Sequence, residues 1–123
     1  MITSDVVGLL ILMSAPFITL IVGVWLYKYP PKKVNYHIGY RTPRSKKSPE
    51  AWREGNRYSS KMLIDMSLIL LGISLLLWFL WDHTEENIIR MTLIETVLLL
   101  VSMGMLILLT ELHLKKMFGN KTE

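Results

Sequence analysis

The chain has 123 residues and a formal net charge of +4, and 51% of its residues are hydrophobic. Because it contains no cysteine, disulfide frameworks, thiol nucleophiles, iron–sulfur clusters and zinc–thiolate sites are excluded. The apolar residues are concentrated in three runs, residues 6–26, 62–81 and 91–112. A helix of about 20 residues spans roughly 30 Å, the thickness of a bilayer core. We therefore expect one membrane domain over residues 1–123: an all-α integral membrane protein with three transmembrane helices.

The first apolar run is hydrophobic on all sides and ends in an aromatic cluster, residues 25–29, typical of a membrane interface. No Lys or Arg precedes it, so we expect a retained span rather than a signal peptide. Ala15, Thr19 and Gly23 recur every four residues and share one helix face. Such a face favours packing against a second copy or another membrane protein. Pro16 predicts a bend.

The charge is distributed unevenly along the chain. Residues 28–61 hold ten Lys or Arg against two acids, whereas residues 82–90 hold three acids and one base. Since short cytoplasmic loops are enriched in Lys and Arg, residues 28–61 are predicted to be cytoplasmic and residues 82–90 external. Lys115, Lys116 and Lys121 place the tail, residues 113–123, inside as well. The predicted topology is N-out, C-in, and we expect no nucleic-acid partner.

The basic connector is predicted to be a loop followed by a long helix. Pro30 and Pro31 end the first helix, and no helical period follows. Ser48 and Pro49 form a helix start, with a hydroxyl cap followed by proline in the first turn. No helix breaker occurs from there to Trp81. We expect one helix that begins in water and continues through the second span.

The water-exposed part of this predicted helix carries two adjacent faces. Its charged stripe has a spacing of four residues and consists of Arg53, Arg57, Lys61 and Asp65. The last two can pair, and the basic members are expected to contact anionic lipid headgroups. Trp52, Asn56, Ser59 and Ser60 lie on the neighbouring face and are interpreted as an aromatic and amide surface.

Ionisable residues inside apolar runs are costly and are therefore candidates for function. Asp65 lies about one turn inside the second run, and Glu95 lies five residues beyond Arg90. Glu111 belongs to a boundary cluster with His113 and Lys115. All of these positions are shallow, so a structural role, in which the side chains reach the interface, stays open beside a functional one.

No catalytic motif is found in the sequence: HExxH, GxSxG and phosphate-binding glycine loops are all missing. His37 and His113 fall on the predicted inner side and His83 on the outer side, which argues against a shared metal site. We therefore expect no enzyme activity, no catalytic residue, no metal and no cofactor.

The densest information lies between residues 35 and 56, where glycine, aromatic, arginine and asparagine residues occur together as in a folded loop. Gly39 permits a turn, and Arg41 offers a planar fork of donors. The candidate binding or structural residues of this signature are Asn35, Ile38, Gly39, Tyr40, Arg41, Thr42, Pro43, Trp52 and Asn56.

The run from Ile38 to Pro43, followed by Ser48, Trp52 and Asn56 before a membrane span, closely resembles the signature of the SdpI-type immunity family. The resemblance implies a bacterial plasma-membrane protein that confers resistance to a secreted, membrane-active peptide. The family's namesake also holds a transcriptional repressor at the membrane. Longer members have six spans, and this chain resembles the half that carries the signature.

The leading hypothesis from sequence is thus a non-enzymatic protein of immunity or tolerance toward a toxic peptide, with the cytoplasmic loop as a binding or signalling surface. Two alternatives stay open. One is an accessory or assembly subunit of a larger membrane complex, or a homo-oligomer, joined through the small-residue face of the first span. The other is a small transporter or enzyme acting on lipid or peptide, which would depend on Asp65 or Glu95.

Overall fold

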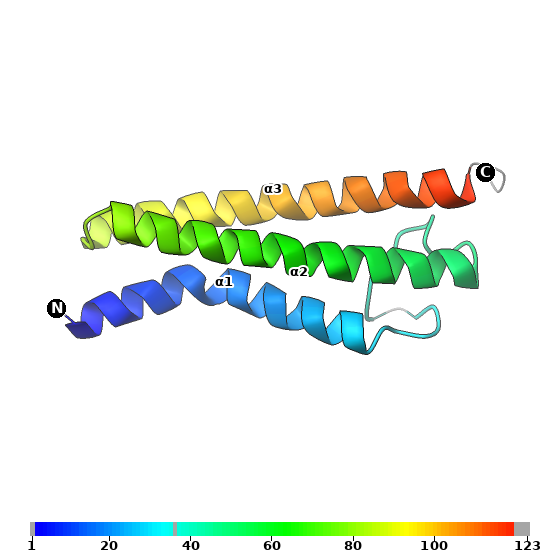
Figure 1. Cartoon of the computed structure of the whole chain (residues 1–123), viewed down its shortest axis with the longest axis horizontal. Helices are drawn as coiled ribbons and strands as arrows, with labels where there is room; N and C mark the ends of the chain where they lie inside the picture. Colours follow the sequence, from blue (N-terminus) through cyan, green and yellow to red (C-terminus); the bar gives the residue numbers. More distant parts are fainter. Residues whose placement is uncertain (1, 36, 120–123) are drawn as a thin grey trace.

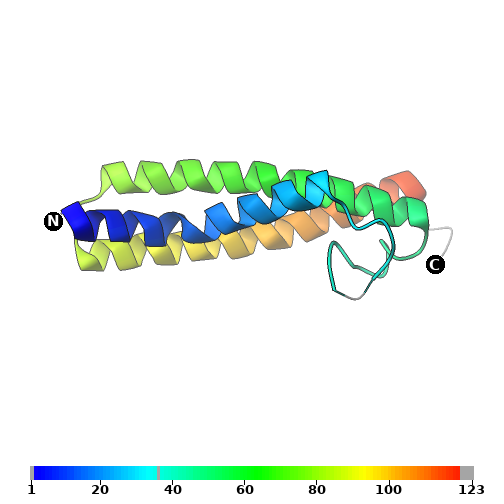
Figure 2. The same cartoon turned by 90° about the horizontal axis from the view of Figure 1, so that it is seen from below.

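The structure is a computed structural model that describes residues 2–35 and 37–119. It contains three long helices, α1 (Ile2–Lys28), α2 (Pro49–Leu80) and α3 (Glu85–Phe118), which lie side by side and alternate in direction (Figure 1). Residues 29–35 and 37–48 fold against the end of the bundle where α3 finishes, here called the loop end (Figure 2). The opposite end, where α2 turns into α3, is called the hairpin end. Lys121 of the predicted tail lies outside the described residues.

Within the described residues, three helices are long and apolar enough to cross a membrane, with mean hydropathies of 2.4, 2.3 and 2.3 over their best windows. Few side chains in these apolar stretches are buried, and Leu10, Ile69 and Leu100 are among those that are exposed. A helix that is apolar all round suits a lipid environment. The chain therefore has the all-helical architecture of a three-span membrane protein, as predicted.

The bounds of α2 follow the sequence prediction closely. Ser48 caps the helix by accepting a hydrogen bond from the Ala51 N–H at 3.0 Å, and proline occupies the first turn. A serine cap satisfies an amide that has no partner within the helix. The helix ends at Leu80, and Trp81 is its C-cap.

The connection between α2 and α3 is shorter than predicted, because α3 begins at Glu85 and not at the start of the apolar run. Thr84 caps it through a 3.1 Å hydrogen bond from the Asn87 N–H, and Arg90 pairs with Glu86 at 2.5 Å. Residues 85–90, expected to be loop, are therefore helical. At its other end α3 continues to Phe118, so residues 113–118 of the predicted tail are helical as well.

The small-residue face of α1 is partly used within the chain. The Thr19 hydroxyl lies 2.8 Å from that of Ser67 on α2, and a Cβ on Gly23 would lie 3.2 Å from the backbone nitrogen of Ile64. Ala15 instead is exposed. The predicted stripe therefore meets α2 at two of its three positions, and the third faces outward.

Near the middle of α1 the helix changes direction (Figure 1). Pro16 lies inside this helix and is buried. Proline removes one backbone hydrogen bond and clashes with the preceding turn, which accounts for a bend. On the hairpin side of the bend, Leu12, Trp78 and Met91 form a buried apolar cluster drawn from all three helices.

Candidate functional site

The loop is attached to α2 by the side chain of Asn56. Its Oδ1 accepts a hydrogen bond from the Tyr40 N–H at 2.6 Å, and its Nδ2 donates to the Tyr40 carbonyl at 3.3 Å and to the Trp52 carbonyl at 2.9 Å. One amide thus satisfies both backbone polar groups of a loop residue, as a neighbouring strand would. Asn56 is 4% exposed, so these bonds form away from water.

Gly39 makes this close approach sterically feasible. Its φ is +100°, in the region that favours glycine. A Cβ at this position would lie 2.4 Å from the Asn56 Oδ1 and 2.8 Å from the Pro31 Cγ. Glycine is therefore required at this position for two reasons: the backbone conformation favours it, and Asn56 occupies the space that a side chain would need.

A second attachment to α2 comes from Trp52, whose side chain is fully buried. Its Nε1 donates a 2.7 Å hydrogen bond to the carbonyl of Pro31. The indole thus fixes the turn that follows α1 against the first part of α2. A buried tryptophan contributes both apolar contact and a directional donor.

The loop is attached to α3 through Glu111. The Tyr40 hydroxyl donates to Glu111 Oε2 at 2.5 Å, the Thr42 hydroxyl donates to the same oxygen at 2.7 Å, and Arg44 Nε lies 3.7 Å from Oε1. Burial is the main cause that raises the pKa of Tyr40 above its ordinary value, and the hydrogen bond to Glu111 is the second. The phenol therefore remains a donor. We call this assembly the loop lock; its members are Gly39, Tyr40, Thr42, Trp52, Asn56 and Glu111.

Ser45 closes the loop inside the lock. It is fully buried, and its hydroxyl donates to the carbonyls of Tyr40 at 3.2 Å and Thr42 at 2.8 Å. Its own N–H donates to the Thr42 hydroxyl at 3.2 Å. The turn is therefore held by its own side chains as well as by the helices.

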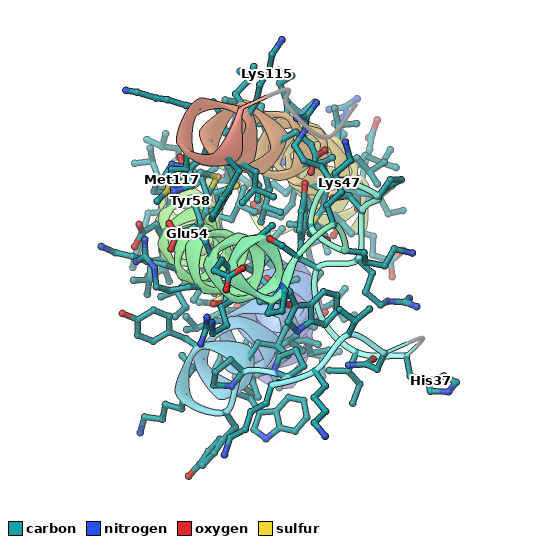
Figure 3. All side chains as sticks on the ribbon, turned by 90° about the vertical axis from the view of Figure 1, so that its right-hand side faces the viewer. His37, Lys47, Glu54, Tyr58, Lys115 and Met117 are labelled. Carbon is teal, nitrogen blue, oxygen red and sulfur yellow. The ribbon has the colours of Figure 1, made fainter. Side chains whose placement is uncertain are left out.

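Beside the loop lock, a polar cluster joins α2 to α3. Its members are Glu54, Arg57, Tyr58 and His113. Glu54 accepts two hydrogen bonds from Arg57, at 2.9 and 2.7 Å, and lies 2.5 Å from His113 Nε2. The His113 ring stacks on Tyr58, with centroids 4.1 Å apart. Figure 3, a view onto the loop end, shows Glu54 and Tyr58 on the side of α2 that approaches α3.

The hydrogen bond from Arg57 lowers the pKa of Glu54 despite the opposing effect of burial, and the contact with His113 lowers it further. The carboxylate in turn raises the pKa of Arg57. The polar cluster thus joins a carboxylate of α2, held by Arg57 of the same helix, to the imidazole of His113 on α3 at the loop end.

The prediction that α2 carries an aromatic and amide surface is wrong, because the residues concerned are not exposed. Trp52, Asn56, Ser59 and Ser60 do share a face, but all four are buried beneath the loop and the neighbouring helices. The sequence pattern showed a common face without showing what covers it. Of the signature residues, Ile38, Arg41 and Pro43 remain exposed, and Asn35 accepts hydrogen bonds from the N–H groups of His37 and Ile38.

The charged residues in and near the apolar runs have different environments. Lys61 and Asp65 are both exposed and, in the part of the chain that the structure describes, form no ion pair with each other. Glu95 is 3% exposed on α3, and neither of its carboxyl oxygens has a hydrogen-bond partner among the described residues. Of these four residues, Glu111 is the one that contacts the signature residues within the part of the chain that the structure describes.

The histidines are spread over the two ends of the bundle. His37 lies to one side of the helices at the loop end (Figure 3), whereas His83 stacks on Trp78 near the hairpin end, with centroids 3.7 Å apart. Across residues 2–35 and 37–119, no three His, Cys, Asp or Glu side chains gather in a way that could hold a metal ion.

Several members of the site were not found from sequence. The sequence patterns place Glu111 only in a boundary cluster, and they predict neither the closure of the loop by Ser45 nor the contact between Glu54 and His113. Tyr40 and Glu111 are 71 positions apart, so no local spacing relates them. The available signal was chemical: two neighbouring hydroxyl side chains in the signature require an acceptor, and Glu111 is an acid at the end of a span.

The fold and the site together define a class: a multi-span, all-helical membrane protein whose basic connector is folded onto the ends of its spans. Within that class the chain belongs to the SdpI/YfhL protein family, whose model matches residues 32–111. It is also 34% identical, over 98 residues, to the uncharacterized protein YfhL of Bacillus subtilis (strain 168), a match that covers 80% of each chain. No solved structure matches the chain. The family resemblance seen in the signature residues is thus confirmed.

Proposed function

We propose that this chain is a non-enzymatic bacterial plasma-membrane protein that confers immunity or tolerance to a toxic, membrane-active peptide. One observation carries the proposal. The segment matched by the SdpI/YfhL family, residues 32–111, contains the whole loop lock and ends on Glu111, the acceptor that attaches the loop to α3. The family signature therefore describes one folded unit rather than scattered residues.

The proposed orientation places the loop end in the cytoplasm and the hairpin end outside. Its support is the excess of Lys and Arg in residues 28–61, compared with the acids Asp82, Glu85 and Glu86 at the hairpin end. In this orientation a peptide that enters from outside meets the outward apolar side chains of the spans first. The loop lock then holds the inner ends of the helices together and presents the exposed part of the signature to the cytoplasm.

The test is expression of the full chain in a peptide-sensitive bacterial host, at verified membrane levels, followed by challenge with a panel of membrane-active peptides. We expect increased survival against at least one peptide. Asn56→Ala, which removes the bonds that hold Tyr40, should abolish protection, whereas the matched loop variant Lys46→Ala should retain it. Survival that is unchanged by the intact protein across the panel would contradict the proposal.

A second candidate, a small transporter or enzyme acting on lipid or peptide, is favoured by the environment of Glu95. A carboxyl group buried in a span, here with no hydrogen bond of good geometry to its oxygens among the described residues, is costly to ionise, and such groups commonly bind a proton or a cationic ligand. The neutral variant Glu95→Gln separates the candidates. Protection that survives this change supports a role in immunity without transport, and protection that is lost in a normally folded variant supports the second candidate.

A further inference from the structure

A pocket of about 470 Å³ lies at the loop end, between the end of α1, the turn that follows it and the outer side of α2. Neither the loop lock nor the polar cluster fills it. Its lining residues are Tyr27, Pro30, Pro31, Lys32, Arg53 and Arg57.

The walls of this pocket are fixed by contacts already present in the protein. The Pro31 carbonyl is held by Trp52 Nε1 at 2.7 Å, and Trp52 is fully buried. Two consecutive prolines have restricted backbones, so the turn between α1 and the loop keeps its shape. The pocket is therefore preformed, and a ligand need not order it.

The charge in the pocket is positive, because its lining contains three cations and no acid. Arg57 is paired with Glu54, but Arg53 has only a 3.8 Å contact with Glu50, and both side chains of that pair are largely exposed. An exposed pair of this kind is weak. Lys32 makes no hydrogen bond or ion pair with any residue in the described ranges. Two cations are thus available for an anionic group.

The position of the pocket indicates the source of that anion. Tyr27 lines it, and the exposed aromatic residues Trp25, in the last turns of α1, and Tyr29, directly after the helix, lie at the same end of the span. Aromatic residues at the end of a span mark the level of the lipid headgroups. Pro30 and Pro31 add apolar walls beside the cations, which suits a phosphate attached to a glycerol backbone better than a free ion.

We propose that this pocket binds the phosphate of an anionic phospholipid. Lys32 and Arg53 would supply the charge, Tyr27 a hydroxyl donor, and the two prolines contact with the glycerol region. The inference goes beyond the proposed immunity function and rests only on the insertion of the chain in a bilayer.

The test measures lipid binding to the purified full chain in detergent, by native mass spectrometry and by thermal stabilisation on addition of the ligand. Three probes are compared: phosphatidylglycerol, phosphatidylcholine and inorganic phosphate. The pocket variant carries both Lys32→Gln and Arg53→Gln. The control variant carries both Lys46→Gln and Lys47→Gln, which remove the same charge from exposed loop positions outside the pocket. Circular dichroism confirms that each variant keeps its helices.

We expect retention of phosphatidylglycerol over phosphatidylcholine, and a roughly tenfold or greater loss of phosphatidylglycerol affinity in the pocket variant, from the contribution of each basic residue near anionic lipid. The control variant should change far less. The assignment would be overturned if the two lipids bound equally or if the two variants lost affinity equally. It would also be overturned if inorganic phosphate alone gave the same thermal stabilisation at similar concentrations. Because the readout is binding and not survival, its failure leaves the test of immunity unaffected.

Discussion

Asn56 on α2 contacts the backbone of Tyr40 at both of its polar groups, accepting from the N–H at 2.6 Å and donating to the carbonyl at 3.3 Å. The side chain of Tyr40 makes a separate contact: its hydroxyl donates a hydrogen bond to Glu111 on α3, at 2.5 Å. Tyr40 is therefore held by one helix through its backbone and by another through its side chain. A loop held in this way keeps the ends of α2 and α3 in a fixed relation.

Asn56→Ala should lower the free energy of unfolding by about 2–4 kcal/mol, because buried backbone groups of Tyr40 and Trp52 lose their partner. The measurement is thermal unfolding in detergent, with trypsin cleavage in residues 29–48 as a local readout. Asn87→Ala, at the hairpin end, is the control and should leave cleavage of the loop unchanged. Equal cleavage rates in the wild-type chain and Asn56→Ala would show that the amide does not hold the loop.

Gly39→Ala tests the close approach of the loop to α2. The added Cβ would meet Asn56 Oδ1 and Pro31 Cγ and would also strain a backbone with φ of +100°. Gly119→Ala is a matched control, since Gly119 also has a positive φ but nothing within 4 Å of an added Cβ. We expect a clearly larger fall in melting temperature for Gly39→Ala. Similar effects at the two glycines would mean that strain alone, and not contact with Asn56, limits this position.

Trp52→Phe removes the donor to the Pro31 carbonyl while keeping an aromatic ring in the buried site. We expect a loss of about 1–3 kcal/mol in the free energy of unfolding, from an unpaired carbonyl and a smaller side chain. Trp81→Phe, at a C-cap that is 37% exposed and whose indole makes no hydrogen bond among the described residues, should cost less than Trp52→Phe. Thermal unfolding of both variants measures these losses. Equal losses of unfolding free energy in the two variants would argue against the contact between Trp52 and the Pro31 carbonyl.

The polar cluster predicts a loss of stability in acid. The pKa of Glu54 is lowered in the folded chain, chiefly by Arg57 and also by His113, from a reference value of 4.5. A lowered folded-state pKa contributes stability above the unfolded value that is lost as the pH falls through the folded value. Thermal unfolding between about pH 6 and about pH 3 should therefore show a decline that Glu54→Gln reduces.

The control for this decline is Glu50→Gln. The Glu50 side chain is 62% exposed and lies 3.8 Å from Arg53, so its loss should leave the pH dependence close to that of the wild-type chain. A pH profile that is identical for the wild-type chain and Glu54→Gln would show that the link between α2 and α3 does not depend on this carboxylate.

The fold could be predicted from sequence because its determinants are local. Apolar runs of bilayer length, the cap at Ser48 and the break at Pro30 each act within a few residues, and the three helices follow from them. The extension of α3 back to Glu85 was missed, since the apolar run starts only at Met91. Its cap, Thr84, lies in a polar segment that hydrophobicity alone assigns to a loop.

The site could be predicted only in part, because its contacts are distant in sequence. The family signature pointed to Gly39, Tyr40, Trp52 and Asn56, and these residues do lie together. Nothing in their spacing shows that Asn56 reaches the backbone of Tyr40, or that the acceptor for Tyr40 is Glu111. Such pairings depend on how the helices pack, and helix periodicity gives the face of a residue but not its neighbour.

We propose that the chain spans the membrane three times and holds its locked basic loop at the cytoplasmic end. The natural chain lacks cysteine, so the single-cysteine variants Lys46→Cys and Glu86→Cys can be compared with no background. Labelling with a membrane-impermeant maleimide should modify Glu86→Cys in intact cells and Lys46→Cys only after permeabilisation. Labelling of Lys46→Cys in intact cells, with Glu86→Cys protected, would contradict the account.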